Sequence, residues 1–293
     1  MLDSDFQLTL IGESINDSVP STRALFDVGD LAGIAALAKA QDEAGADYID
    51  VNVGTRGPDV MAELVRRIQE VTTKPLSIDT PDYDTAKAGL EAYDTGKAEG
   101  AKPLLNSISP MRIATFELLD IQPFCAILLA SERMADSGYA AACRNAEETY
   151  RTASEMRFFA SRCGLENEDL FFDPGIPPAA TDTEGGLKRV LETLRRMRAD
   201  EEFARSRVSV GLSNFTVMLP SKRPDGSPVK GPLESAFLSL AVPLGLDTII
   251  GSVKRKYRRL DEDHPAARCV GAMLAAEGFD SLLAVKDYYE GAY

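Results

Sequence analysis

The sequence predicts a (β/α)8 TIM barrel that forms a single domain over residues 1–293. Strand-like and helix-like segments alternate in strict order along the 293 residues, which is typical of a parallel α/β sheet. The strand-like segments are almost continuously apolar, as expected for parallel strands that are buried on both faces. A doubly wound open sheet would show the same alternation, but the sequence lacks a GxGxxG stretch after the first strand, which weakens that alternative.

Eight segments have the composition of buried strands, because they are short, rich in Val, Ile, Leu and Phe, and bounded by turn residues. The second, YIDVNVG, is unusual because it carries an aspartate and an asparagine among its apolar residues. The predicted strands are 7–13, 48–54, 75–79, 102–108, 124–130, 170–175, 208–213 and 247–252.

Helical patterns fill the gaps between these strands. In the segment after the first strand, Leu31, Ile34 and Ala38 recur at helical spacing and Asp30 is a plausible N-cap. The longest turn-rich stretch, 221–232, separates the seventh strand from the seventh helix, on the side where barrels keep their active sites. Further helices are predicted over 59–71, 83–93, 111–119, 142–163, 185–199, 232–242 and 265–277, with a terminal helix over 281–293.

Composition excludes several classes of function. The net charge is −14, which disfavours nucleic-acid binding because that needs clustered Lys and Arg. No stretch approaches about 18 consecutive apolar residues, and the acidic N-terminus does not resemble a signal peptide, so we expect no membrane span and a cytoplasmic location. The one basic run, 254–259, follows the eighth strand. A solvated loop or helix face explains it more simply than an anion or partner site.

The cysteines and the single histidine do not predict a catalytic or metal site. Cys125, Cys143, Cys163 and Cys269 are dispersed and lack CxxC spacing, so we expect reduced thiols and no metal. His264 lies between acidic residues and a proline, which indicates a helix start at the surface. No GxSxG stretch accompanies it, which argues against a Ser-His-Asp mechanism.

Polar residues gather at the carboxyl ends of the predicted strands. Asp50 and Asn52 illustrate the pattern, since an unpaired polar group buried at a strand end costs about 1–3 kcal/mol. In a barrel all these ends face one mouth. We therefore expect an acidic, amide-rich pocket with almost no Lys or Arg, which suits a neutral heterocycle with several N–H donors better than a phosphate. The other members of the set are Glu13, Asn16, Asp79, Asn106, Ser107, Asp173, Ser213 and Asn214.

Six motifs, each at a strand end and in this order, give the sequence a family resemblance over nearly its whole length. They are IGESIN, GADYIDVNVGT, PLSIDT, KPLLNSIS, LFFDPGI and GLSNFTVMLP. The sequence resembles the pterin-binding methyltransferases, which implies transfer of a methyl group between the cobalt of a corrinoid protein and N5 of tetrahydrofolate. One departure is visible, since Ser14 replaces the arginine that the first motif often carries, which affects the first loop rather than the pterin contacts.

The resemblance also implies roles for individual residues. Asp173 would hold the pterin N3–H and 2-amino group, and Asp79 and Asn106 would hold the far edge of the ring. Asn214 would lie near N5 as the catalytic residue. Gly211 and Ser213 would shape its turn, and Glu13 and Asn52 would line the same mouth.

The substrates would be tetrahydrofolate or methyltetrahydrofolate, and a separate corrinoid protein would supply the cobalamin, because the DxHxxG signature of cobalamin-binding modules is absent. We expect the loops 17–29 and 217–232 to contact that partner. Relatives of this kind form homodimers, and we expect the same here.

Other functions remain open at this stage. Dihydropteroate synthase shares the barrel and the DPG strand, but its family uses a lysine after strand seven and an Arg-x-His near the C-terminus, and neither stands in the matching turns here. A glycoside hydrolase could use Asp79 and Asp173 as its carboxylate pair, although the chain has no tryptophan for a sugar platform. A non-catalytic binding protein would bind folate without transferring a methyl group.

Overall fold

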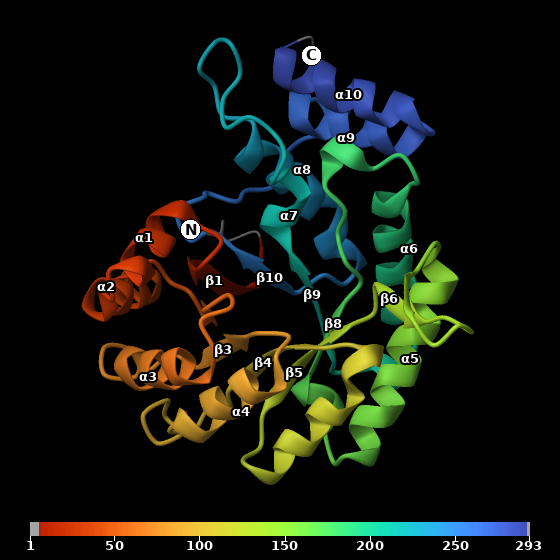
Figure 1. Ribbon diagram of the computed structural model, residues 1–293. Helices are drawn as coiled ribbons and strands as arrows, with labels where there is room; N and C mark the ends of the chain where they lie inside the picture. Colours follow the sequence, from red (N-terminus) through yellow and green to blue (C-terminus); the bar gives the residue numbers. More distant parts are fainter. Residues whose placement is uncertain (1–5, 292–293) are drawn as a thin grey trace.

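The computed structural model, which describes residues 6–291, is built around a closed barrel of eight parallel strands with helices on its outside (Figure 1). The strand order around the barrel is β1-β10-β9-β8-β5-β4-β3-β2. This is the predicted (β/α)8 TIM barrel. Its strands are β1 (Thr9–Asn16), β2 (Tyr48–Asn52), β3 (Leu76–Asp79), β4 (Leu104–Ile108), β5 (Cys125–Leu129), β8 (Leu170–Asp173), β9 (Arg207–Gly211) and β10 (Thr248–Gly251).

The helices follow the strands in the expected alternation. Between β4 and β5 the connecting helix is a 3₁₀ helix, η1 (Pro110–Asp120), interrupted at Arg112 by non-helical backbone angles. The α-helices are α1 (Pro20–Asp27), α2 (Leu31–Glu43), α3 (Pro58–Ile68), α4 (Tyr83–Ala92), α5 (Ala146–Arg162), α6 (Gly186–Ala199), α7 (Leu212–Thr216), α8 (Lys230–Ala241), α9 (Pro265–Ala275) and α10 (Phe279–Glu290). Short 3₁₀ turns lie at η2 (Asn167–Asp169), η3 (Ala179–Thr181), η4 (Glu201–Phe203) and η5 (Val242–Leu244).

Two apolar layers stabilise the barrel. The larger lies between the strands and the surrounding helices and includes most of the buried Leu, Ile, Val and Phe side chains. The smaller consists of Ile11, Leu104, Ile127 and Phe171, with Tyr48 packed edge-on against the Phe171 ring at 6.2 Å between centroids. We attribute this small cluster to the barrel interior, where layers of apolar side chains fill the space below the mouth. That packing holds the strand ends in place.

Three local features differ from the sequence prediction. The segment 17–29 contains α1, a short helix that begins with a proline and buries Thr22 and Phe26, instead of being a loop throughout. The hairpin of β6 (Glu132–Met134) and β7 (Ala140–Ala142) was not predicted, because three alanines have little strand propensity. The helix expected to begin at 142 therefore starts at Ala146, after the N-cap Asn145.

Two further predictions concern the cysteines and the helices. No disulfide links the four cysteines, all of which lie within the described residues. The terminal helix is present as α10, although residues 292 and 293 lie outside the described residues. Within the described chain, no helix combines the length and apolar character needed to cross a bilayer.

Candidate active site

A cavity of about 780 Å³ lies at the carboxyl ends of the barrel strands, within the range of small-molecule sites in proteins. The structure brings nearly all the predicted site residues together around it. Asn52 does not line the cavity and lies behind Asp79 instead. The predicted residues that do line it are Glu13, Asn16, Asp50, Asp79, Asn106, Asp173, Gly211, Ser213 and Asn214.

Two carboxyl groups form the centre of the cavity floor. Asp50 and Asp79 are hydrogen-bonded to each other, and burial raises the pKa of both, that of Asp50 well above its usual range. Asp50 also accepts from the Ser77 hydroxyl at 2.6 Å and from the Asn106 amide at 3.3 Å, while Asp79 accepts from the Asn52 amide at 2.8 Å. Like charges this close favour one shared proton. We therefore assign that proton to Asp50, which leaves Asp79 as the acceptor facing the cavity.

A third carboxylate, Asp173, projects from the end of β8. Its Oδ1 accepts a hydrogen bond from the Gly175 backbone N–H at 2.7 Å, which fixes the side chain at the carboxyl end of the strand. Burial raises the pKa of Asp173 to about 6, opposed by that hydrogen bond and by the charge of Arg189. Arg189 in turn donates to the Gly175 carbonyl at 2.6 Å, so it holds the loop rather than neutralising the carboxylate directly. Asp173 is thus an anion at neutral pH with capacity for further donors.

The side of the cavity formed by β1 and β9 carries a hydroxyl, a carboxylate and an amide. Ser213 donates to Glu13 at 2.8 Å, and burial raises the pKa of Glu13. Asn214 is exposed at the cavity edge. A Cβ at Gly211 would lie 2.7 Å from the Asn214 Nδ2 atom, so a side chain at this position would displace the amide from its present place.

Cations at the mouth were missed by the sequence analysis. The expectation of a pocket with almost no Lys or Arg is wrong, because Lys230, Lys254 and Arg255 all line the cavity. Two of them belong to the basic run 254–259, for which the prediction favoured a simple solvated face. The run itself was visible in the sequence, but only the closure of the barrel shows that its first residues turn towards the mouth.

Arg255 is held by a buried partner. Its guanidinium donates to Glu234 on α8, a residue with 0% exposure that also accepts from the Thr216 hydroxyl. The cavity therefore combines an acceptor-rich floor, formed at β2, β3, β4 and β8, with a positively charged edge next to β9 and β10. Such a site can hold the donor edge of a flat heterocycle and an anionic group at opposite ends.

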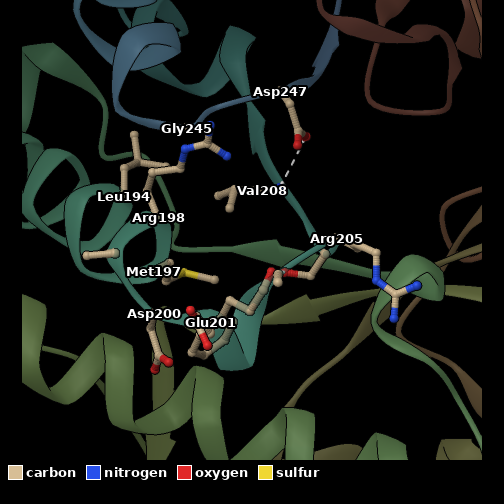
Figure 2. A pocket seen from close by; sticks show the side chains of 13 residues that line it. Leu194, Met197, Arg198, Asp200, Glu201, Arg205, Val208, Gly245 and Asp247 are labelled. Atoms are coloured by element: carbon tan, nitrogen blue, oxygen red, sulfur yellow. Dashed lines mark hydrogen bonds between the residues drawn. The ribbon is translucent and has the colours of Figure 1, made fainter.

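A smaller hollow of about 280 Å³ lies at the amino ends of β9 and β10, beside α6 (Figure 2). Three of its charged groups are paired with other protein groups. Asp247 accepts from the Val208 backbone N–H at 3.2 Å, marked by the dashed line in Figure 2, and from the Thr248 hydroxyl at 2.8 Å. Asp200 accepts from the Tyr150 hydroxyl, and Arg205 pairs with Glu168.

The model of the family described as "pterin binding enzyme" matches residues 15–251. The chain belongs to the pterin-binding enzymes. This match confirms the family that the six strand-end motifs predicted. The structure adds that these motifs converge on one cavity.

One relative and two solved structures are similar to the chain over most of its length. The chain is 27% identical over 259 residues, 83% of its length and 84% of the relative's, to a methylcorrinoid:tetrahydrofolate methyltransferase from Eubacterium limosum. Among solved structures it is similar to dihydropteroate synthase of Xanthomonas albilineans, with a TM-score of 0.57, 17% identity and 90% of each chain covered. Dihydropteroate synthase of Yersinia pestis gives a TM-score of 0.56, 14% identity and coverage of 98% and 94%. At these identities the structures support the fold alone.

Proposed function

We propose that this enzyme transfers a methyl group between N5 of tetrahydrofolate and the cobalt of a corrinoid held by a partner protein. The observation that carries the proposal is the floor of acceptors, Asp79 and Asp173, facing one cavity that Asn214 borders. The name of the Eubacterium limosum relative, which covers most of both chains, supports this reaction over other pterin chemistry.

In this proposal the floor recognises the pterin ring by its donors. A carboxylate accepts hydrogen bonds only, so Asp173 suits the adjacent N3–H and 2-amino group. Asp79 and the Asn106 amide meet the far edge of the ring. Because Asn52 donates to Asp79 at 2.8 Å, we assign Asn52 to positioning that carboxylate rather than to contacting the ligand.

Methyl transfer at N5 is an in-line displacement, so positioning and charge matching lower most of the barrier. When methyltetrahydrofolate is the donor, N5 needs a hydrogen-bond donor as it becomes a leaving group. When tetrahydrofolate is the acceptor, N5 attacks and then loses a proton. The Asn214 amide supplies both a donor and an acceptor, which fits either direction.

The corrinoid would supply a cobalt atom that gives or takes the methyl group. Exposed apolar side chains beside the cavity support the docking of such a flat macrocycle over the mouth. Val19 is 37% exposed, Val217 is 57% and Met218 is 62%. These residues belong to the segments 17–29 and 217–232 that we expect to contact the corrinoid protein.

The test is a direct assay of the reaction. The protein is mixed with methylcobalamin and tetrahydrofolate, and we expect loss of the methylcobalamin spectrum together with formation of methyltetrahydrofolate. Folate binding without any spectral change, even with a corrinoid protein present, would instead indicate a non-catalytic pterin-binding role.

Dihydropteroate synthase is the second candidate, because Lys230 and Arg255 at the mouth could bind an anionic leaving group. Incubation with a dihydropterin pyrophosphate ester and p-aminobenzoate distinguishes the two functions. We expect no dihydropteroate. Its formation at an enzymatic rate would replace methyl transfer by the synthase reaction.

We also propose that the enzyme is a homodimer in solution. The support is the apolar surface of α10, where Phe279 is 79% exposed and Leu283 is 54% exposed. Light scattering should give twice the chain mass of 31.7 kDa. A monomer at micromolar concentration would contradict this assembly.

A further inference from the structure

Three cations form one edge of the candidate active site. Lys230 begins α8, and Lys254 and Arg255 follow β10. We call these three residues the cation rim. A second cavity of about 520 Å³ adjoins the first, since both are lined by Lys230 and Arg255. The second cavity carries two more cations, Lys256 and Arg258.

The two lysines of the cation rim have no ion-pair partner among the described residues. Within residues 6–291, neither Lys230 nor Lys254 takes part in an ion pair. The Lys230 ammonium donates only a long hydrogen bond, 3.4 Å, to the Val217 carbonyl. Burial and the neighbouring charge of Arg255 lower the pKa of Lys230. Two lysines at the cavity edge without an ion-pair partner leave positive charge available to an anionic ligand.

Arg255 is held in its orientation by a buried residue, which indicates that the positive charge at this edge of the cavity is fixed in place. Glu234 is fully buried beneath the mouth and accepts from both Arg255 and Thr216. Arg255 itself is 27% exposed in its side chain, so it reaches from a buried anchor into the cavity. An anchored guanidinium loses less conformational freedom when it binds a carboxylate.

The chemistry of the proposed substrate supplies a matching anion. In tetrahydrofolate, the p-aminobenzoyl-glutamate tail is attached at C6, next to N5 and on the ring opposite N3. With the donor edge of the pterin on the floor and N5 near Asn214, the tail leaves on the side of β9 and β10. This is the side on which Lys230 lies, within hydrogen-bond reach of Val217.

We propose that the cation rim binds the glutamate carboxylates of the folate tail, and that the adjoining cavity receives further γ-linked glutamates. This inference rests on the proposed function, because it assumes a folate in the first cavity. It identifies the substrate class as tetrahydrofolates with anionic, polyglutamylated tails. Pterins whose tails lack several carboxylates would bind less tightly.

The experiment compares three ligands by calorimetry: 6-methyltetrahydropterin, which has no tail, tetrahydrofolate monoglutamate and tetrahydrofolate triglutamate. We expect the wild-type protein to bind the triglutamate at least about ten-fold more tightly than the tail-free pterin, with a steep loss of that difference in added salt. Lys230→Ala and Lys254→Ala should each weaken triglutamate binding by about 3–10-fold and leave the tail-free pterin unchanged. Lys222→Ala is the matched control, since Lys222 is exposed and lines neither cavity.

The outcomes separate the two proposals. Equal affinities for all three ligands, or equal losses for every ligand in the lysine variants, would overturn the tail site while leaving pterin binding intact. Failure of the wild-type protein to bind any of the three would overturn the proposed function itself. A third outcome would also overturn the inference. If inorganic pyrophosphate competes with the ligands only when Lys230 and Lys254 are present, and ligand affinity does not depend on the number of glutamates, the cation rim binds a pyrophosphate leaving group instead.

Discussion

The charged groups at the two ends of the barrel differ in whether they have partners within the protein. At the amino end, Asp200, Asp247 and Arg205 are each satisfied by a protein partner, and the hollow they border is small. At the carboxyl end, the acceptors of the floor and the lysines of the cation rim point into a larger cavity. Asp200, Asp247 and Arg205 are thus satisfied within the fold, whereas Asp173 and the two lysines at the carboxyl end keep hydrogen-bonding capacity for a ligand.

This difference agrees with the division of roles between the two ends of a barrel, where stability lies at the bottom and chemistry at the top. Burial raises the pKa of Asp173 at the mouth to about 6, and it also raises that of Asp247 at the amino end. A raised pKa alone therefore does not identify the functional end. What distinguishes Asp173 is that the described residues give its carboxylate one hydrogen bond, from the Gly175 backbone N–H, so it can accept others from a ligand.

The largest expected effect comes from the Asn214→Ala substitution. We expect the single-turnover rate of methyl transfer to fall by about 100-fold, the range seen when one transition-state hydrogen bond is removed, while the folate dissociation constant changes by less than about three-fold. The matched control is Asn167→Ala at the amino end, whose amide donates to two backbone carbonyls at 2.9 Å. Equal rates for the Asn214 variant and the wild type would remove its catalytic role.

The next effect is on ligand affinity. Asp173→Asn replaces a carboxylate acceptor by an amide, and we expect the folate dissociation constant to rise by about 30-fold, equivalent to about 2 kcal/mol. The control, Asp247→Asn, should leave folate affinity unchanged. A dissociation constant that does not change in the Asp173 variant would contradict the proposed grip on the pterin.

The same substitution should stabilise the protein without ligand. The folded pKa of Asp173, about 6, lies above its usual value of 3.8, so ionisation opposes folding. The difference of about 2.2 units corresponds to roughly 3 kcal/mol as an upper bound. This cost is present above pH 6 and disappears as the pH falls towards 4. Thermal unfolding should therefore show that Asp173→Asn raises Tm at pH 7.5 and not at pH 4; a lower Tm at pH 7.5 would contradict the burial argument.

A smaller effect is expected from pH in the wild-type protein. Folate binding needs the Asp173 carboxylate, so affinity should be constant above pH 6 and fall by about ten-fold per unit below it. Asp79 and Glu13, whose pKa values are also raised by burial, would steepen the decline. Fluorescence titrations from pH 5 to 8 measure the profile. Affinity that stays flat down to pH 5 would show that the carboxylate is not the acceptor.

The smallest effect is expected at the amino end. Tyr150→Phe removes the hydroxyl that donates to Asp200, and we expect a loss of about 1 kcal/mol in unfolding free energy. Folate affinity and methyl transfer should stay within two-fold of the wild type. A large loss of activity in a variant with a normal Tm would mean that the two ends of the barrel are coupled.

The sequence predicted which strand-end residues gather at the cavity, because strand ends are fixed by local patterns. Asp79 and Asn106 each end or nearly end a buried strand, and the barrel register places them directly opposite each other. Asn52 was assigned to the same mouth, yet its amide donates to Asp79 instead. This contact depends on the neighbouring strand β3, which the local pattern around Asn52 does not describe. Asp50 was noted as a strand-end residue, but its shared proton depends on distances that sequence does not contain.

The cation rim could not be predicted, for a different physical reason. Lys230 follows a long loop, and its distance from Arg255 in space depends on how β9, α8 and β10 close the barrel. A basic run by itself does not reveal which of its side chains face solvent. Similarly, α1 was missed because its buried residues, Thr22 and Phe26, are too few to give a clear helical period.

The pairing of Glu234 with Arg255 ties the charge of the mouth to the integrity of the fold. Loss of the arginine alone would leave the buried Glu234 carboxylate without its ion-pair partner and lower the free energy of unfolding by about 3–5 kcal/mol. We therefore expect the two residues to be lost only together. Homologous chains should therefore show either both or neither. A chain with neither would keep only the two lysines of the cation rim, and its mouth would hold anions more weakly.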